Sequence, residues 1–479
     1  MRQPDANATM VSDTEAPVAP AKSLGVSGLL LVSDNNDAYA IRVLLARHAV
    51  RSIDVMYYLW RADSTGSLLT AELIRAADRG VRVRMLLDDI NPFNSDQAHI
   101  ALNSHPNIQL RLFNPSRARD GWFRRGVELA SNLFRLTRRM HNKAMIVDGE
   151  YALVGGRNVA DAYFDQAETN FRDLDALMRG QATRQTMEIF ERFWDCPSSV
   201  PIDRLNPAPA MGKRRALREL AGALSTADTA EVQHRANLYE NVNAFIDRAG
   251  GFCWTNSADV ISDPPEKADG QGRDGWLLTA LLDRIQSSRQ TLKITSPYFI
   301  PGKRGVATLS KLVRDGVRTT VLTNSLAATD VAAVHGGYAN YRKELLRNGV
   351  ALFELQPFER GQKMSMFGSK GASLHTKAFI VDDRSAFVGS FNFDPRSVSL
   401  NTEMGVLFEH EGLIGRLREL FDLEIAPDTS YRLSLEGNRL RWDAEEGGAA
   451  QTYFSEPEAT LFRRFVAAIV RYLPIESQL

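Results

Sequence analysis

The chain has 479 residues, with 58 basic and 58 acidic side chains and 44% hydrophobic residues. This charge balance argues against a polybasic protein whose whole surface binds nucleic acid, and the hydrophobic content argues against disorder over the whole length. Only two cysteines occur, Cys196 and Cys253, so we exclude a disulfide framework and a cysteine-based zinc site.

The N-terminal region predicts a tail and no membrane anchor. Residues 1–22 contain three prolines among small polar residues, which is typical of a disordered tail. The apolar run from Leu24 to Val32 is shorter than the roughly 20 residues of a membrane span, and it lacks the pattern of a signal peptide. The sequence therefore predicts a protein that stays on the cytoplasmic side and reaches lipid from the membrane surface.

Strands and helices alternate twice along the chain. Ser52 to Trp60 reads as a strand, and Leu73 to Asp89 reads as a helix that stops at Gly80 and continues as an apolar strand. Alternation of this kind predicts a mainly parallel or mixed sheet. The corresponding second-copy segments are Thr291 to Phe299 and Leu309 to Ser325, with the stop at Gly316.

A polar motif is repeated at an offset of 234 residues. His141, Lys143 and Asp148 in the first copy have the same spacing as His375, Lys377 and Asp382 in the second. In both copies an asparagine follows 17 residues after the histidine, as Gly156-Arg157-Asn158 and as Ser390-Phe391-Asn392. A repeat of this length predicts two copies of one structural unit within the chain.

Each motif reads as a hairpin that presents a half-site. The apolar strand Ala144 to Val147 is followed by Asp148 and Gly149, a strong turn pair, and a helix is expected to begin near Asn158. His141 and Lys143 are two residues apart and therefore lie on the same face of a strand.

Two such half-sites suit a phosphodiester. Lysine and asparagine donors can hold phosphate oxygens, while one histidine attacks phosphorus and the other protonates the leaving oxygen. No metal is required, and the eight histidines form no metal-binding motif, so we expect neither a metal nor a cofactor.

The acidic residues have different expected roles. Asp148 and Asp382 are expected to cap turns, although each belongs to the catalytic motif. Asp173 and Glu403 lie further downstream, and each is expected to bind the second ring nitrogen of a catalytic histidine and fix its tautomer.

With these two H-x-K-x-x-x-x-D elements, the sequence resembles the phospholipase D superfamily and, within it, bacterial cardiolipin synthases of the C type. Closer matches include Val154 to Asn158 and Gly389 to Ser397. The resemblance implies an α/β protein of two pseudo-twofold-related α/β/α halves with mixed sheets and one active site at their interface. One departure is Gly156, which stands where the second copy has Ser390, so one hydroxyl donor is expected to be missing.

The resemblance also implies a phosphatidyltransferase with a ping-pong reaction. His141 would attack a phosphatidyl donor to give a phosphohistidine, and His375 would protonate the leaving alcohol and then deprotonate the acceptor. The acceptor would be phosphatidylglycerol, and the donor either a second phosphatidylglycerol or phosphatidylethanolamine. The enzyme would be peripheral to the bacterial inner membrane. The alternatives are a hydrolytic phospholipase D, a nucleic-acid phosphodiesterase and a non-catalytic membrane-binding protein; we expect no nucleic-acid partner.

Two segments bear on membrane contact. Residues 117–139 hold seven arginines against two acidic residues, with aromatic and apolar residues at near-helical spacing. This segment either lies on anionic lipid or forms the solvated basic flank of a core helix. The apolar stretch from Leu461 to Leu473 predicts a helix that packs against the core.

These features together predict the division of the chain. The expected regions are a disordered tail (1–22), a first half (23–196), a linker with connecting helices (197–250), a second half (251–425) and a C-terminal extension (426–479).

Overall fold

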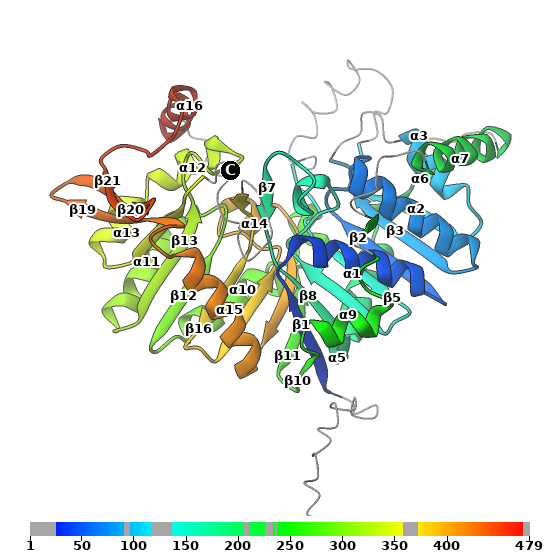
Figure 1. The fold of residues 1–479 in the computed structure, drawn as a ribbon, viewed down its shortest axis with the longest axis horizontal. Coiled ribbons are helices and arrows are strands. Elements are labelled where there is room, and N and C mark those ends of the chain that lie inside the picture. Colours follow the sequence, from blue (N-terminus) through cyan, green and yellow to red (C-terminus); the bar gives the residue numbers. More distant parts are fainter. Residues whose placement is uncertain are drawn as a thin grey trace, which may run out of the picture.

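The computed structural model describes residues 25–90, 96–116, 137–205, 210–225, 233–234, 237–357 and 372–472. The tail predicted over residues 1–22 lies outside this part of the chain. Two α/β halves stand side by side, each built on one large mixed sheet, as the sequence predicts (Figure 1).

The first sheet holds nine of the described strands. Its order is β10 (Cys253–Thr255), β1 (Ser27–Val32), β8 (Asp175–Gly180), β6 (Tyr151–Gly155), β5 (Ala144–Val147), β2 (Ser52–Tyr57), β3 (Arg82–Asp88), β4 (Ile108–Phe113) and β9 (Ser199–Pro201). Only β2, β3 and β4 run parallel to one another, because helices connect them. The short strand β10, which the predicted boundary assigns to the second half, extends this first sheet.

The second sheet repeats this plan and is longer. Its order is β11 (Ala258–Ser262), β18 (Met404–Phe408), β17 (Ser385–Gly389), β16 (Ala378–Val381), β12 (Thr291–Thr295), β13 (Arg318–Asn324), β14 (Ala351–Leu355), β19 (Ser430–Glu436), β20 (Arg439–Glu446) and β21 (Ala449–Tyr453). Strands β12, β13 and β14 are the parallel set. The C-terminal strands β19 to β21 continue the sheet beyond β14.

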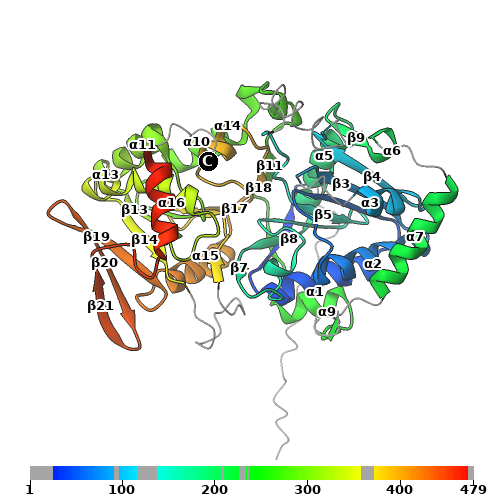
Figure 2. The same ribbon diagram turned by 90° about the horizontal axis from the view of Figure 1, so that it is seen from above.

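Most helices cover the outer faces of the sheets, and the inner faces share one core to which one helix of each half also contributes. The helices of the first half and the connection are α1 (Asn35–His48), α2 (Ser64–Asp78), α3 (Asp96–Asn103), α5 (Gln181–Trp194), α6 (Ile202–Leu205), α7 (Ala210–Ser225) and α9 (Val242–Arg248). Those of the second half are α10 (Leu277–Gln286), α11 (Gly302–Arg314), α12 (Ala332–Ala339), α13 (Arg342–Arg347), α14 (Pro395–Ser399), α15 (Glu411–Glu424) and α16 (Leu461–Tyr472). Between the sheets, Met56 and Val154 of the first half belong to the same buried cluster as Ile380 and Val406 of the second. Seen from above, the two sheets meet along β8, β17 and β18 (Figure 2).

The motif aspartates anchor turns at the end of the sheet away from the histidines. Asp148 and Asp382 both have positive φ, 56° and 54°, at the start of a hairpin turn. The Asp382 carboxylate accepts the backbone N–H groups of Arg289, Gln290 and Thr291, and Asp148 does the same for residues 50–52. Each aspartate therefore ties its hairpin to the loop that enters the neighbouring strand. Neither contacts a catalytic histidine.

This anchoring predicts a pH-dependent contribution to stability. Burial alone would raise the pKa of Asp382, but the three N–H donors lower it below its ordinary value. Asp382→Asn keeps the shape and tolerates the positive φ but removes the charge, so we expect unfolding to become easier by about 1 kcal/mol. A lowered carboxyl pKa stabilises above the unfolded value, so the difference from wild type should shrink as pH falls below about 4 and vanish below the lowered pKa of the folded protein. Urea unfolding at pH 7 and pH 3 measures this. Asp383→Asn is the control, and an equal loss there would contradict the anchor.

Two sequence predictions on helices are wrong. No α-helix begins near Asn158; the chain there forms only a short 3₁₀ turn, Asp161–Tyr163, whereas the second copy forms α14. The C-terminal helix α16 does not pack its apolar face on the core, because the side chains of Leu461, Phe462 and Phe465 are exposed. Within the described residues, no helix has both the length and the apolar character needed to cross a bilayer.

Candidate active site

Short segments of the two halves pair with each other at their interface. β7 (Asn170–Arg172) of the first half pairs in parallel with β15 (Ala372–Leu374) of the second, and Arg172 O accepts the backbone N–H of His375 at 2.7 Å. The other crossing is a single parallel bridge between Met140 and Thr402, where Thr402 O accepts the N–H of His141 at 2.9 Å. Each pairing joins the residue before one histidine to the residue before a carboxylate of the opposite half.

This register fixes two histidine–carboxylate pairs that cross the interface. His141 Nδ1 lies 2.8 Å from Glu403 Oε2, and His375 Nδ1 lies 2.5 Å from Asp173 Oδ2. A carboxylate accepts hydrogen bonds, so each acid favours the tautomer with the proton on Nδ1 and leaves Nε2 for the reaction. Lys377 Nζ also lies 2.7 Å from His375 Nδ1. The structure thus brings together four residues that the sequence singles out, with each acid serving the histidine of the other half.

Two further residues hold the histidine segments in place. At the end of β3, Asp88 Oδ2 accepts the N–H of Met140 at 2.8 Å; at the end of β13, Asn324 Oδ1 accepts the N–H of Leu374 at 2.9 Å. Burial raises the pKa of Asp88 to about 7. Sequence reasoning missed both residues, although they occupy matching places in the two aligned strand segments.

Both motif lysines are buried beside their histidines. Lys143 Nζ donates to the carbonyl of His141 at 2.6 Å, and Lys377 Nζ donates to the carbonyl of His375. Burial lowers the pKa of Lys377 to about 8, and burial also lowers the pKa of Lys143. When protonated, these lysines can direct their remaining N–H donors and their positive charge at a bound phosphate.

Burial lowers the pKa of both imidazoles. Burial, with the nearby positive charges of Lys143 and Lys377, lowers the pKa of His141 well below its usual value. Burial and Lys377 lower the pKa of His375 as well, but the Asp173 carboxylate opposes this shift. A histidine with an unprotonated Nε2 is therefore available at neutral pH, which nucleophilic attack requires.

The two orienting acids differ in environment. Burial raises the pKa of Glu403 to about 7, and its carboxylate accepts the hydroxyls of Ser390 at 2.5 Å and Ser397 at 2.7 Å. Burial also acts to raise the pKa of Asp173, but the charges of Lys377 and His375 outweigh it and lower that pKa. The site is therefore electrically asymmetric, because the acid beside His375 has a lower pKa than the acid beside His141.

Gly156 lacks the hydroxyl donor that Ser390 has in the second copy, but its small size also leaves room for Asp173. A Cβ at residue 156 would lie 2.2 Å from Asp173 Oδ1. The first copy thus combines a glycine with the shorter acid, and the second combines Ser390 with the longer Glu403.

Introducing a serine at residue 156, to match Ser390 of the second copy, should therefore reduce activity. In Gly156→Ser the new side chain must displace the Asp173 carboxylate, so we expect the transfer rate to fall at least about a hundredfold. Ser390→Gly is the matched control: it removes one of the hydroxyls that Glu403 accepts and makes no clash, and we expect a smaller loss. Initial rates, with thermal unfolding to check the fold, distinguish the two. A Gly156→Ser protein with wild-type rate would contradict the steric account.

The asparagines support the site from behind. Asn158 Oδ1 accepts the N–H of Leu59 at 3.2 Å, and its Nδ2 donates to Tyr163 Oη at 2.8 Å. Tyr163 Oη in turn lies 3.4 Å from His375 Nε2. Asn392 is also buried, and its backbone N–H donates to Ser397 Oγ. Asn158 thus reaches the reaction space through the Tyr163 hydroxyl.

Aromatic side chains close the site around the histidines. Tyr58 contacts the His141 ring edge to face, with centroids 4.9 Å apart, and Lys143 Nζ lies 5.3 Å from the Tyr58 centroid. Tyr163 and Phe171 flank His375 at 5.1 and 4.9 Å. Sequence reasoning did not assign these aromatics to the site.

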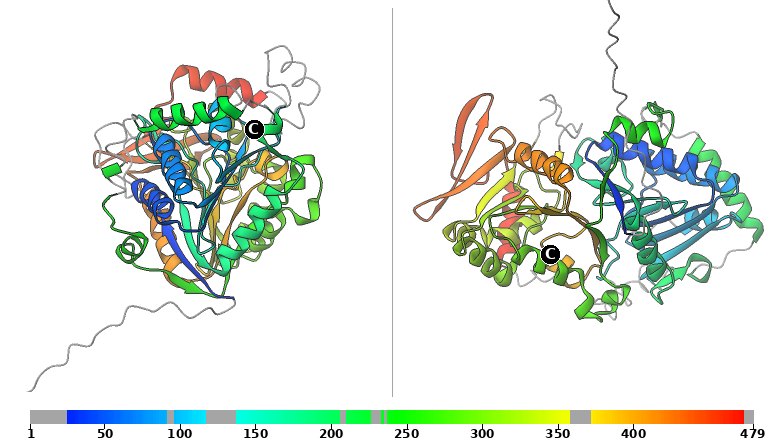
Figure 3. Two further views of the ribbon diagram at one scale, coloured as in Figure 1. Left: turned by 90° about the vertical axis from the view of Figure 1, so that its right-hand side faces the viewer. Right: turned by 90° about the horizontal axis from the view of Figure 1, so that it is seen from below.

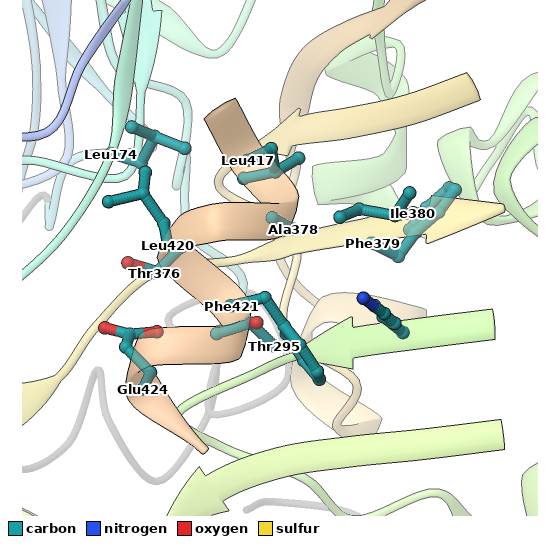
Figure 4. A pocket seen from close by; sticks show the side chains of 11 residues that line it. Leu174, Thr295, Thr376, Ala378, Phe379, Ile380, Leu417, Leu420, Phe421 and Glu424 are labelled. Atoms are coloured by element: carbon teal, nitrogen blue, oxygen red, sulfur yellow. The ribbon is translucent and has the colours of Figure 1, made fainter. Parts of the chain in front are cut away.

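A small cavity lies behind the second motif. Residues of β16 and α15 line it, and its labelled side chains are mainly apolar, with the Glu424 carboxyl at one end (Figure 4). Burial raises the pKa of Glu424 to about 7. Its lining includes Thr376, Ala378 and Phe379 but neither a histidine nor a motif lysine, so we assign it no part in the chemistry.

Most of the predicted basic segment, residues 117–136, lies outside the described residues. Its described end points inward: Arg138 Nη1 donates to the carbonyls of Lys267 and Ser399, and Arg139 Nη1 lies 3.4 Å from Asp88 Oδ1. These two arginines therefore bind the protein itself.

The known proteins that this chain resembles include cardiolipin synthases. The family model described as cardiolipin synthase, phospholipase D-like domain, matches residues 44–194 and 281–424. Cardiolipin synthase C of Escherichia coli K12 is 38% identical over 460 residues, covering 94% of this chain and 96% of its own. A cardiolipin synthase of Oceanobacillus iheyensis is 25% identical and covers 82% of this chain and 67% of its own.

The fold has a counterpart among solved structures. The phosphatidylserine synthase of Haemophilus influenzae superposes with a TM-score of 0.62 at 14% identity, covering 94% of this chain and 95% of its own. At that identity the likeness concerns the fold alone. Taken with the matched family model and the relatives, it leads to one conclusion: this chain belongs to the phospholipase D-like cardiolipin synthase family and is a phospholipid phosphatidyltransferase.

Proposed function

We propose that this phosphatidyltransferase makes cardiolipin, moving a phosphatidyl group from a phospholipid donor to phosphatidylglycerol through a phosphohistidine. The observation that carries the proposal is the crossed pairing: His141 with Glu403, and His375 with Asp173. Two buried histidines, each oriented by a carboxylate through Nδ1, present two Nε2 atoms to one phosphodiester. That arrangement suits a reaction with one nucleophile and one proton carrier.

In the first half-reaction, His141 Nε2 forms a bond to the donor phosphorus. For this step His375 is doubly protonated, with one proton on Nδ1 held by Asp173 and one on Nε2; the P–O bond to the headgroup alcohol breaks, and the Nε2 proton passes to the leaving oxygen. The site asymmetry supports these roles: burial and the lysines lower the pKa of both histidines, but for His375 the Asp173 carboxylate opposes this shift and favours the protonated form. Lys143 and Lys377 balance the charge on the phosphoryl oxygens.

In the second half-reaction, His375 takes the proton from a phosphatidylglycerol hydroxyl. The resulting oxygen attacks phosphorus, the P–N bond to His141 breaks, and cardiolipin leaves. The donor is a second phosphatidylglycerol or phosphatidylethanolamine; the two give glycerol or ethanolamine as the released alcohol. We further propose that the enzyme works as a peripheral protein on the cytoplasmic side of the bacterial inner membrane.

Lipid extracts from a cardiolipin-deficient bacterium that expresses this chain test the proposal. We expect cardiolipin with the wild-type chain and none with His141→Ala at equal protein level. Donor identity follows from supplying phosphatidylethanolamine with a labelled headgroup and measuring released ethanolamine. Phosphatidic acid without cardiolipin would replace the proposal with a hydrolytic phospholipase D, and no lipid change would favour the phosphodiesterase or non-catalytic alternatives.

A further inference from the structure

The helix α16 presents its most apolar face to solvent. Leu461, Phe462, Phe465 and Ile469 are 85%, 74%, 62% and 42% exposed, and their spacing places them on one side of the helix. A helix on the surface of a water-soluble protein normally turns such a face inward. A patch of large apolar side chains that faces outward marks an interaction site.

The opposite face of α16 is firmly attached to the protein. A Cβ on Gly336 of α12 would lie 2.6 Å from Ala467 O, so the two helix backbones approach closely through small residues. Arg463 Nη1 donates to Leu326 O at 3.1 Å and to Thr329 O at 2.5 Å. Rotation of the helix to bury its apolar face would break these contacts, so the exposed orientation is built into the fold.

The charge of α16 indicates which partner its apolar face binds. The helix carries Arg463, Arg464 and Arg471 and no acidic residue between Leu461 and Tyr472. These arginines lie on the side of the helix away from the apolar face, where they donate to Leu326 O, Thr329 O, Glu456 O, Ala459 O and Asn340 Oδ1. A positively charged helix whose apolar side faces outward matches the surface of a bilayer with anionic headgroups. Phosphatidylglycerol, the acceptor in the proposed function, is itself anionic.

The position of α16 fits this role. Figure 1 shows α16 at the same end of the molecule as β7, and the left view of Figure 3 also shows this C-terminal helix at the top. The loop that Arg463 binds follows β13 directly, and Asn324 at the end of β13 bonds the residue before His375. The same loop carries Asp330, whose carboxylate accepts the hydroxyl of Tyr298.

We propose that α16 is a membrane-docking helix, which inserts Leu461, Phe462, Phe465 and Ile469 into the surface of an anionic bilayer and seats the active-site end of the enzyme on it. The inference rests on the proposed function for the nature of the lipid. It is tested by vesicle binding, which requires no turnover.

The first test is sedimentation with vesicles of mixed phosphatidylcholine and phosphatidylglycerol. We expect the wild-type chain to bind, and the combined variant Leu461→Ser, Phe462→Ser, Phe465→Ser and Ile469→Ser to bind at least about tenfold more weakly, since each fully buried apolar side chain is worth roughly a factor of ten. The control combines Val50→Ser, Leu238→Ser and Leu423→Ser, which lie elsewhere and are 76%, 53% and 46% exposed. Circular dichroism confirms that both variants are folded.

A second measurement uses an environment-sensitive dye attached to Phe462→Cys, with Cys196 and Cys253 replaced by alanine. We expect low emission in buffer and a rise with a blue shift on addition of the mixed vesicles. Emission that is already high in buffer would overturn the proposal: if it falls on dilution, a second copy of the chain covers the helix, and if it does not, another part of the same chain does.

Unchanged vesicle binding by the fourfold variant, or no binding by the wild type, would also overturn it. Failure of the proposed chemistry looks different, because the wild type would then bind vesicles through α16 and yield no cardiolipin.

Discussion

The His375→Ala protein should become trapped as a covalent phosphatidyl-enzyme when it is given an activated phosphodiester. A donor with a good leaving group needs little protonation, so His141 can still attack phosphorus. The second alcohol then lacks its base, and the adduct persists. His141→Ala should form no adduct with the same donor, and both variants should lose at least about 10⁴-fold of the transfer rate with natural lipids.

The measurement is intact-protein mass after brief exposure to the activated donor. Wild-type protein serves as the reference, in which the adduct should form and then decay when an alcohol is added. An adduct on His141→Ala that maps to His375 would reverse the two roles. Absence of any adduct on wild type and on both variants would remove support for the covalent mechanism.

A variant of each orienting acid should behave like the variant of the histidine that it binds, which belongs to the opposite half. Asp173 belongs to the first half but binds His375, so Asp173→Asn should behave like His375→Ala and accumulate adduct from the activated donor. Glu403 belongs to the second half but binds His141, so Glu403→Gln should behave like His141→Ala and form adduct slowly or not at all. We expect each amide to cost about 10³- to 10⁴-fold in rate, because it favours the wrong tautomer of its histidine.

Adduct formation and adduct decay, followed separately by mass, distinguish these outcomes. Asp148→Asn serves as the control, because that carboxylate binds only backbone groups in a distant turn. If each acid variant instead matched the histidine of its own half, the crossed pairing would be wrong.

Local chemistry explains why much of the fold could be predicted from the sequence. The Asp148-Gly149 pair and the apolar runs around it specify a hairpin within a few residues, and β5 and β6 form it. The repeated spacing from His141 to Asn158 and from His375 to Asn392 predicts two equivalent units, and the two mixed sheets follow the same plan. Such features depend on contacts between near neighbours in the chain.

The remaining features depend on contacts between distant parts of the chain. The pairing of Arg172 with Leu374 joins residues about 200 positions apart, so no local pattern states which acid meets which histidine. Tyr163 was missed because it is not repeated in the second copy. The equivalent residue there is Ser397, whose hydroxyl binds Glu403. For α16, helical spacing identifies an apolar face, but only the packing on Gly336 determines that this face turns outward.

The pairing of segments from the two halves also determines when the active site becomes complete during synthesis of the chain. N-terminal domains of large proteins generally fold first on the ribosome. When the first half has emerged, His141 has no carboxylate, because Glu403 has not yet been translated, and Asp173 has no histidine to orient. Reactive chemistry is thereby withheld from the nascent chain, and a product truncated anywhere before Glu403 carries an incomplete site.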